Sequence, residues 1–200
     1  MDAVETVMRE QGYAALSARN VAARAGLKYQ IVFYYFETMD DLLLATYRRR
    51  TQAVLERTER ALQSEQPLHA LWSLHSDPSD AALSLEYIAM SNHSQVIRAE
   101  TVAFGEQIRR LVAQRLSAPL QRVSPDLSVF TPSGITLALT SLGSMLGFES
   151  ALGLSGGHRE STAIVQWFLQ RLEPAAASAA PPTRALHRPR ERAHRGNHDE

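Results

Sequence analysis

The strongest constraint on the fold is a glycine, Gly26, between two short helical segments near the start of the chain. Residues 18–25 before it and residues 28–35 after it have apolar side chains at helical spacing, and Ser17 suits the N-cap of the first segment. Because glycine adopts a positive φ at no steric cost, it permits a sharp turn between two helices. Two short helices joined in this way predict a helix-turn-helix unit.

The rest of the chain predicts more helices and no sheet. Apolar side chains recur at helical spacing, glycines and prolines mark breaks, and no run of alternating β-branched residues is long enough for a strand. The sequence therefore predicts an all-α protein of about nine helices. The remaining predicted helices cover residues 2–11, 40–64, 67–76, 78–93, 95–121, 160–172 and a segment that begins at Pro132.

Composition excludes several classes of protein. The 200 residues are 44% hydrophobic, which is enough for a core, and the absence of cysteine excludes disulfides and thiolate sites. No apolar run reaches the roughly 18 residues of a membrane span, and early charges at Glu5, Arg9 and Glu10 do not fit a signal peptide. We therefore expect a cytoplasmic protein without a membrane partner. The formal net charge is zero, so nucleic-acid binding must depend on local geometry.

The second helix of the pair is the one expected to contact DNA. Such a helix fits the major groove, where glutamine can bond an adenine edge, lysine can bond guanine or a phosphate, and tyrosine hydroxyls can donate to phosphates. The inward positions are expected to be Val21, Ala25, Leu27, Val32 and Tyr35. The outward positions are expected to be Lys28, Tyr29, Gln30, Phe33 and Tyr34.

Residues 1 to about 48 resemble the DNA-binding domain of tetracycline-repressor-type transcriptional regulators. The resemblance rests on "GYAALSARNVAARAGL", "VFYYF" and "DDLLLATY" taken together. It departs from the family pattern at Met39, where a phosphate-binding lysine is usual, and at Phe33, where a tyrosine is usual; Tyr34 or Tyr35 would then supply the phosphate contact. Family members also usually have a further turn before the position of Met1, so we expect an upstream start. The resemblance implies DNA contacts by Ser17, Arg19, Lys28, Tyr29, Gln30, Phe33, Tyr34 and Tyr35. The alternative is a three-helix bundle that binds nothing and uses its aromatics as core.

In the resembled family, the rest of the chain is a helical domain that binds a small-molecule effector. Taken singly, an apolar residue of the middle helices is more often ordinary core than a ligand contact. Glu149 stands out because a carboxylate within an apolar helix needs a partner or a cationic ligand; an intersubunit salt bridge to an arginine is the alternative. The candidate effector-binding residues are Trp72, Tyr87, Met90, Phe104, Ile108, Met145, Phe148 and Glu149.

The last two helices are the candidate dimer interface. Small residues spaced by four form a strip on the eighth helix, and such a strip lets another helix approach closely. Two recognition helices must span about 34 Å of DNA, which favours a dimer over a monomer. The alternative is that the strip packs within one subunit. The candidate interface residues are Gly143, Gly147, Ala151, Ile164, Trp167 and Phe168.

Together these patterns predict a homodimeric transcriptional regulator that binds operator DNA and is released by an effector, most simply as a repressor. The alternatives are an activator, or a regulator that responds to a protein partner. No catalytic constellation, cofactor motif or metal-ligand spacing is present, so an enzyme is not expected. The predicted domains are residues 1–47 for DNA binding, 48–173 for effector binding and dimerisation, and 174–200 as a disordered Ala/Pro/Arg tail.

Overall fold

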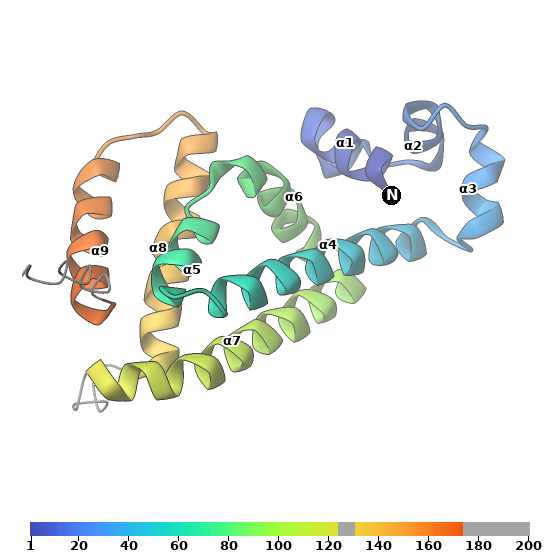
Figure 1. The fold of residues 1–200 in the computed structure, drawn as a ribbon. Coiled ribbons are helices and arrows are strands. Elements are labelled where there is room, and N and C mark those ends of the chain that lie inside the picture. The colour runs from blue at the N-terminus through green and yellow to red at the C-terminus, as the bar shows by residue number, and fades with distance from the viewer. Residues whose placement is uncertain (124–130, 174–200) are drawn as a thin grey trace, which may run out of the picture.

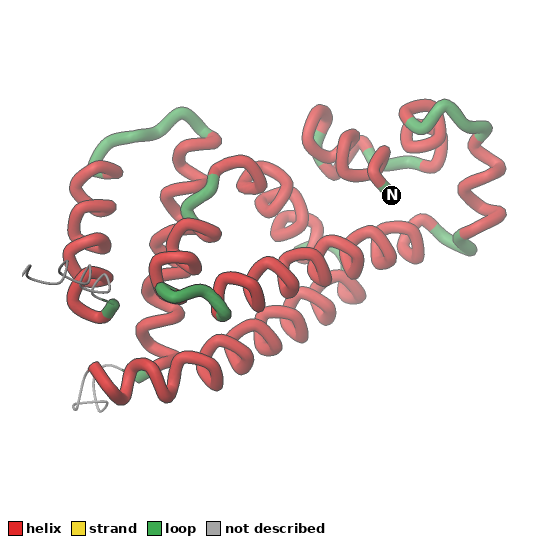
Figure 2. Tube along the Cα trace, viewed as in Figure 1, coloured by secondary structure: helices red, strands yellow, loops and turns green. Residues whose placement is uncertain are grey.

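The computed structural model describes residues 1–123 and 131–173, and its regular structure is entirely helical (Figures 1 and 2). No strand occurs in these two ranges, so the prediction of an all-α fold is confirmed. Two 3₁₀ turns, Tyr13–Ala15 and Pro78–Asp80, precede α2 and α6. The α-helices are α1 (Asp2–Gln11), α2 (Ala18–Arg24), α3 (Tyr29–Tyr35), α4 (Met39–Leu62), α5 (Pro67–His75), α6 (Ala81–Ser91), α7 (Gln95–Val123), α8 (Pro132–Ala151) and α9 (His158–Leu172).

The long helices α4 and α7 pack against each other and form the spine of the molecule (Figure 1). Helices α1, α2 and α3 gather at one end of this spine, whereas α8 and α9 lie at the other. Helix α8 packs on α5, α6 and α7, and α6 also contacts α1. The fold therefore connects the helix-turn-helix end to the body by two routes, through α4 and through α6.

The start of α4 is fixed by a reciprocal pair of hydrogen bonds. The Asp41 amide donates to the Thr38 hydroxyl at 3.1 Å, and the Thr38 amide donates to the Asp41 carboxylate at 3.0 Å. This capping box satisfies two amides that the first helical turn would leave without partners. The capping box thus fixes the residue at which α4 begins after α3.

The first hydrophobic core crosses from the helix-turn-helix end into the body. It contains Val4, Val21 and Val32 from α1, α2 and α3, together with Leu83 and Tyr87 from α6. The three N-terminal helices thus share their core with α6 and do not enclose one of their own. The domain boundary at residue 47 stays a prediction.

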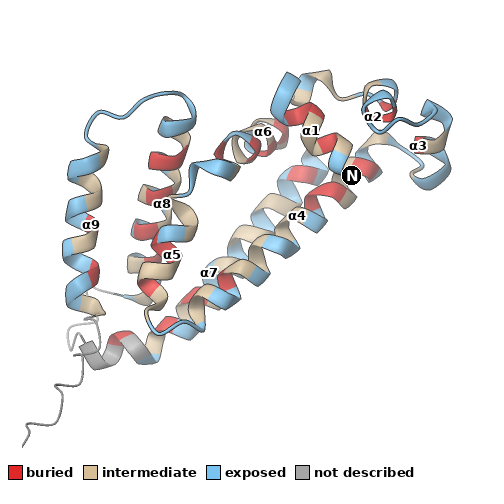
Figure 3. Cartoon of the chain, turned by 45° about the horizontal axis from the view of Figure 1, so that its top comes forward, coloured by how far each residue is buried: buried red, intermediate tan, exposed pale blue. Residues whose placement is uncertain are grey.

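A second core holds α5, α7, α8 and α9 together, with Leu71 and Leu169 among its buried members. The Glu173 carboxylate, just after α9, accepts hydrogen bonds from the amides of Leu68 at 2.7 Å and His69 at 3.1 Å. Because these amides belong to the first turn of α5, Glu173 caps that helix and attaches the end of α9 to it. Most of the remaining surface of α9 is exposed or half-buried (Figure 3).

The predicted tail, residues 174–200, lies outside the described residues, as do residues 124–130. Within the described ranges, no helix combines the length and the apolar character that a bilayer crossing requires.

Candidate nucleic-acid interface and internal cavity

The turn between α2 and α3 is built by local hydrogen bonds and one glycine. The Ser17 hydroxyl accepts a bond from the Asn20 amide at 3.2 Å and so caps α2, as its sequence position predicts. Gly26 has a φ of 67°, in the left-handed region that favours glycine. The Leu27 amide donates to the Ala22 carbonyl at 2.9 Å and closes the turn. Residue Lys28 is extended and stands at the N-cap of α3.

Helix α3 buries one residue and exposes all four of its aromatic side chains. Val32 is its single buried side chain, whereas Tyr34 is 81% exposed and Tyr35 is 71% exposed. The rings of these two tyrosines meet edge to face at 5.0 Å, so they form one aromatic surface. Tyr29 and Phe33 are also exposed. An exposed cluster of this size on two helical turns is unusual for a surface with no partner.

The expected inward positions are only partly right. Val21 and Val32 are buried as predicted, but Ala25, Leu27 and Tyr35 are exposed. Ala25 and Leu27 belong to the turn, whose backbone directs them away from the core. Tyr35 ends α3, and the extended residue that follows it, Phe36, packs against the core in its place.

The other predicted DNA contacts are exposed as well. Lys28 and Gln30 are exposed, as predicted. The Arg19 guanidinium lies 5.7 Å from the centre of the Tyr29 ring, so a cation–π contact joins α2 to the start of α3. Arg24 of α2 forms an ion pair with Glu10 of α1 at 2.6 Å, which joins these two helices.

The body contains a cavity of about 320 Å³ between α4, α5, α6, α7 and α8. Three of the predicted effector-binding residues, Tyr87, Phe104 and Phe148, line it. Trp72 and Met90 do not line the cavity; each is buried in a hydrophobic core.

The remaining predicted effector-binding residues also lie elsewhere. Ile108 packs against the second core, and Met145 is 52% exposed on α8. Glu149 has a partner within the chain, since its carboxylate lies 2.8 Å from Nε2 of His158. Glu149 therefore has a partner without an intersubunit arginine. These corrections reflect helical rotation, which composition alone does not determine.

The sequence analysis does not predict the charged residues that line the cavity. Arg50 and Arg57 line it from α4, and both contact the Asp80 carboxylate, at 3.4 Å and 2.9 Å respectively. Burial opposes ionisation of Asp80, but the hydrogen bond from Arg57 and the charges of both arginines outweigh it and hold the Asp80 pKa below its usual value. The spacing of seven between the two arginines, which places them on one helical face, could have indicated this cluster.

The small-residue strip of α8 is covered within the chain. A Cβ at Gly143 would lie 3.1 Å from the His75 Cβ and 3.2 Å from the Ser76 nitrogen, and Gly147 approaches the Asp77 carbonyl. Gly143 and Gly147 are buried, whereas Ala151 is exposed. The expectation that these glycines face a second subunit is therefore corrected: they let α8 approach the end of α5. Ile164, Trp167 and Phe168 remain exposed on α9.

A helix-turn-helix with an exposed second helix, attached to a larger helical body, is the arrangement typical of helix-turn-helix DNA-binding proteins. Residues 1–46 match the family model for bacterial regulatory proteins of the tetR family. This match confirms the resemblance of the N-terminal region to tetracycline-repressor-type regulators.

Comparison with solved structures supports the fold beyond that region. A transcriptional regulator from Rhodococcus sp. Rha1 is similar in structure, with a TM-score of 0.62 and 18% sequence identity. The similarity covers 86% of this chain and 89% of that one. No curated protein sequence matches the chain.

Proposed function

We propose that this protein is a homodimeric repressor that binds operator DNA through α3 and is released from it by a small-molecule effector. The observation that carries the proposal is the uncovered aromatic surface of α3, above all Tyr34 at 81% exposed. Three tyrosine hydroxyls and a glutamine on α3, with the lysine at its N-cap, supply the donors that contact phosphates and base edges in the major groove. A purely structural helix would bury these rings or replace them with charged residues.

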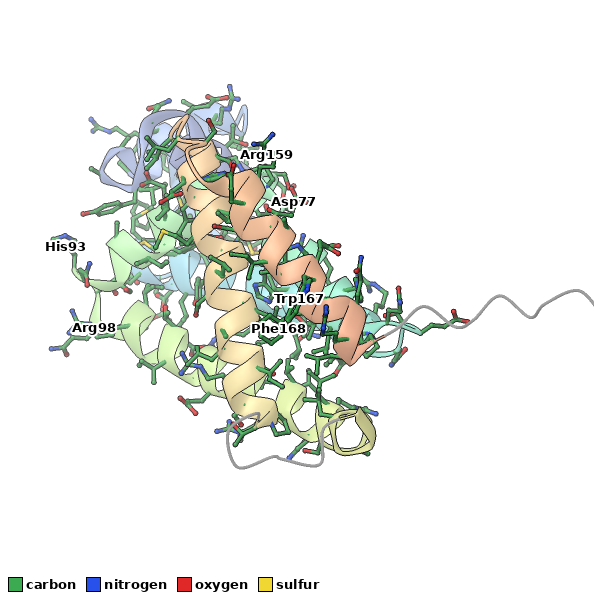
Figure 4. All side chains as sticks on the ribbon, turned by 90° about the vertical axis from the view of Figure 1, so that its left-hand side faces the viewer. Asp77, His93, Arg98, Arg159, Trp167 and Phe168 are labelled. Carbon is green, nitrogen blue, oxygen red and sulfur yellow. The ribbon has the colours of Figure 1, made fainter. Side chains whose placement is uncertain are left out.

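Exposed apolar side chains on α8 and α9 support the dimer. Ile164 is 61% exposed, Trp167 is 51% exposed and Phe168 is 42% exposed. Figure 4 places Trp167 and Phe168 next to each other on α9, and their rings meet at 5.2 Å. Leu137 and Met145 add exposed apolar surface on α8. Aromatic residues grouped in this way are typical anchors of protein interfaces.

The cavity supports effector control, and so do two contacts that join the helix-turn-helix end to α6 and to the 3₁₀ turn before it. The Tyr13 amide donates to the Glu86 carboxylate at 2.6 Å, and Arg9 lies 3.4 Å from Asp80. Asp80 also borders the cavity, so one side chain contacts both the cavity wall and the helix-turn-helix end. An effector that shifts α6 or α4 would move α3 relative to its counterpart in the dimer. It can do so only by binding one arrangement more tightly than the other.

The test is binding of the purified protein to DNA from upstream of its own gene, at two salt concentrations. Tyr34→Ala and Gln30→Ala are compared with Gln114→Ala, an exposed residue of α7 on the body. We expect the wild type and the α7 variant to bind equally and both α3 variants to bind more weakly. For Gln30→Ala, the loss of a base contact worth roughly 1–3 kcal/mol corresponds to about 5- to 150-fold. Affinity should fall steeply with salt because phosphate contacts release counterions. Unchanged binding by both α3 variants would refute the proposed interface.

A further inference from the structure

Three residues that line the cavity each have a buried polar atom with no hydrogen-bond partner among the described residues. These atoms are Nε of Arg57, Nε2 of His75 and the hydroxyl of Tyr87. All three residues line the same cavity, and no other buried side-chain nitrogen or oxygen in the described ranges lacks a partner. Buried polar groups are almost always hydrogen-bonded, so their collection in one place indicates a site for a ligand that supplies the partners.

The chemistry of these atoms selects ligand groups that accept hydrogen bonds. The Arg57 Nε–H can only donate, and a neutral tyrosine hydroxyl or histidine ring can also donate. Burial raises the pKa of Tyr87, so its phenol stays protonated at neutral pH. Burial also lowers the pKa of His75, so its ring is neutral there. A ligand with two acceptor oxygens close together could bond more than one of these donors.

The charges on the wall balance, but both of its carboxylates already have partners, so a cationic ligand would find no free acceptor there. Arg50 and Arg57 face two carboxylates, Asp77 and Asp80. Asp77 accepts a hydrogen bond from the Ser79 amide at 2.9 Å and thus caps the 3₁₀ turn. Asp80 contacts Arg50, Arg57 and also Arg9 from outside the cavity, so three cations share its single charge. With Arg9 included, the cluster has one positive charge in excess.

The rest of the wall is apolar and partly aromatic. The Tyr47 and Tyr87 rings pack at 5.0 Å from α4 and α6, and Phe104 and Phe148 line the cavity from α7 and α8. Val54 adds an aliphatic side chain from α4. A volume of about 320 Å³ lies at the lower end of the range of small-molecule pockets, roughly 300–1,000 Å³, so the cavity suits a small occupant.

We propose that the cavity binds a small aromatic monocarboxylate, whose carboxylate accepts hydrogen bonds from Arg57 and Tyr87 and whose ring packs between Phe104 and Phe148. The proposal rests on the proposed function, because it names the chemical class of the effector. Arg50 is already engaged, with Ser84 at 3.0 Å and the Tyr87 ring at 5.8 Å. Arg57 contacts Asp80 through Nη2, so its Nε is the donor that remains for the ligand.

The test measures binding of four probes of similar size to the full chain by calorimetry: benzoate, phenylacetate, benzamide and benzylamine. We expect the two carboxylates to bind at least tenfold more tightly than the neutral benzamide, and the cationic benzylamine to bind weakest. Equal binding of benzoate and benzamide, or preference for benzylamine, would overturn the assignment. So would the absence of binding by both carboxylates.

Three variants locate the site. Tyr87→Phe should weaken carboxylate binding about tenfold while leaving the melting temperature unchanged or raised, because it removes a buried hydroxyl that has no partner in the chain. Arg57→Lys keeps the charge but loses the Nε donor, so it should also weaken binding. Arg109→Gln, on the exposed side of α7, is the matched control and should change nothing. Unaltered affinity in Tyr87→Phe, with its fold retained, would refute the role of this cavity.

The same probes are then added to the protein–DNA complex. This step distinguishes a wrong ligand class from a wrong release mechanism. If carboxylates bind the protein but do not release DNA, the effector site is supported and the release mechanism is wrong. If DNA binds specifically but no carboxylate binds the protein, the regulator is supported and the proposed ligand class is wrong.

Discussion

Substitution of alanine at three helical glycines should give effects of different size and sign, because the three positions have different free space. A Cβ at Gly143 would stand 3.1–3.2 Å from His75 and Ser76, and two of these contacts are to backbone atoms. At Gly147 the nearest atom would be 3.5 Å away, an ordinary contact distance, and at Gly105 nothing lies within 4 Å.

Each substitution gains about 0.8–1 kcal/mol of helix propensity. At Gly105 and Gly147 this gain should remain, so the free energy of unfolding should rise by up to about 1 kcal/mol. At Gly143 the backbone of α5 cannot move aside easily, and overpacking costs about 1–3 kcal/mol. We therefore expect Gly143→Ala to be less stable than Gly105→Ala by about 1–3 kcal/mol, which corresponds to a melting temperature lower by roughly 2–12 °C at this chain length.

The assay is urea unfolding followed by far-ultraviolet circular dichroism, repeated at two protein concentrations tenfold apart. If the glycine strip packed against a second subunit, the losses in Gly143→Ala and Gly147→Ala would be similar and would depend on protein concentration. Equal stability of Gly143→Ala and Gly105→Ala would refute the close approach of α8 to the end of α5.

Three further changes test caps and a buried base. Thr38→Ala removes the capping box with Asp41 and should cost about 0.5–2 kcal/mol in the free energy of unfolding, measured by urea titration. Glu173→Gln should cost about 1 kcal/mol by weakening the charged cap at Leu68, and added salt should reduce the difference. Because His75 has a lowered pKa when folded, the unfolded chain binds more protons below pH 6.5; stability should fall as pH drops through that value, by at most about 1.4 kcal/mol per pH unit, and His75→Gln should reduce this dependence.

The fold could be predicted from the sequence because its helices are marked locally. Ser17, Gly26 and Thr131 stand at or beside helix ends, and each has the cap or turn geometry that its residue type favours. Helix spacing then predicts which residues cluster on one side. The exposed positions of Tyr34 and Gln30 follow from the same local pattern.

The cavity could be predicted only in part, since it depends on contacts between distant segments. Phe104 and Phe148 were identified by size and position, but Trp72 and Met90 have the same character and lie in the cores. Which apolar side chain faces a void depends on helix rotation and crossing angle, and a single sequence does not determine either. The charged wall was missed because its cluster joins Arg57 on α4 to Asp80, 23 positions later.

The small-residue strip of α8 is compatible with two opposite predictions, packing within one chain and packing between two subunits. A small-residue strip predicts that another helix comes close, but the strip does not say whether that helix belongs to the same chain. Here the end of α5 occupies the position over Gly143. The proposed dimer interface therefore consists of bulky exposed residues, above all Trp167. No part of the described chain buries them as α5 buries Gly143. If the dimer forms, it should therefore depend on these aromatic side chains, and α8 should reach the partner mainly through exposed residues such as Met145.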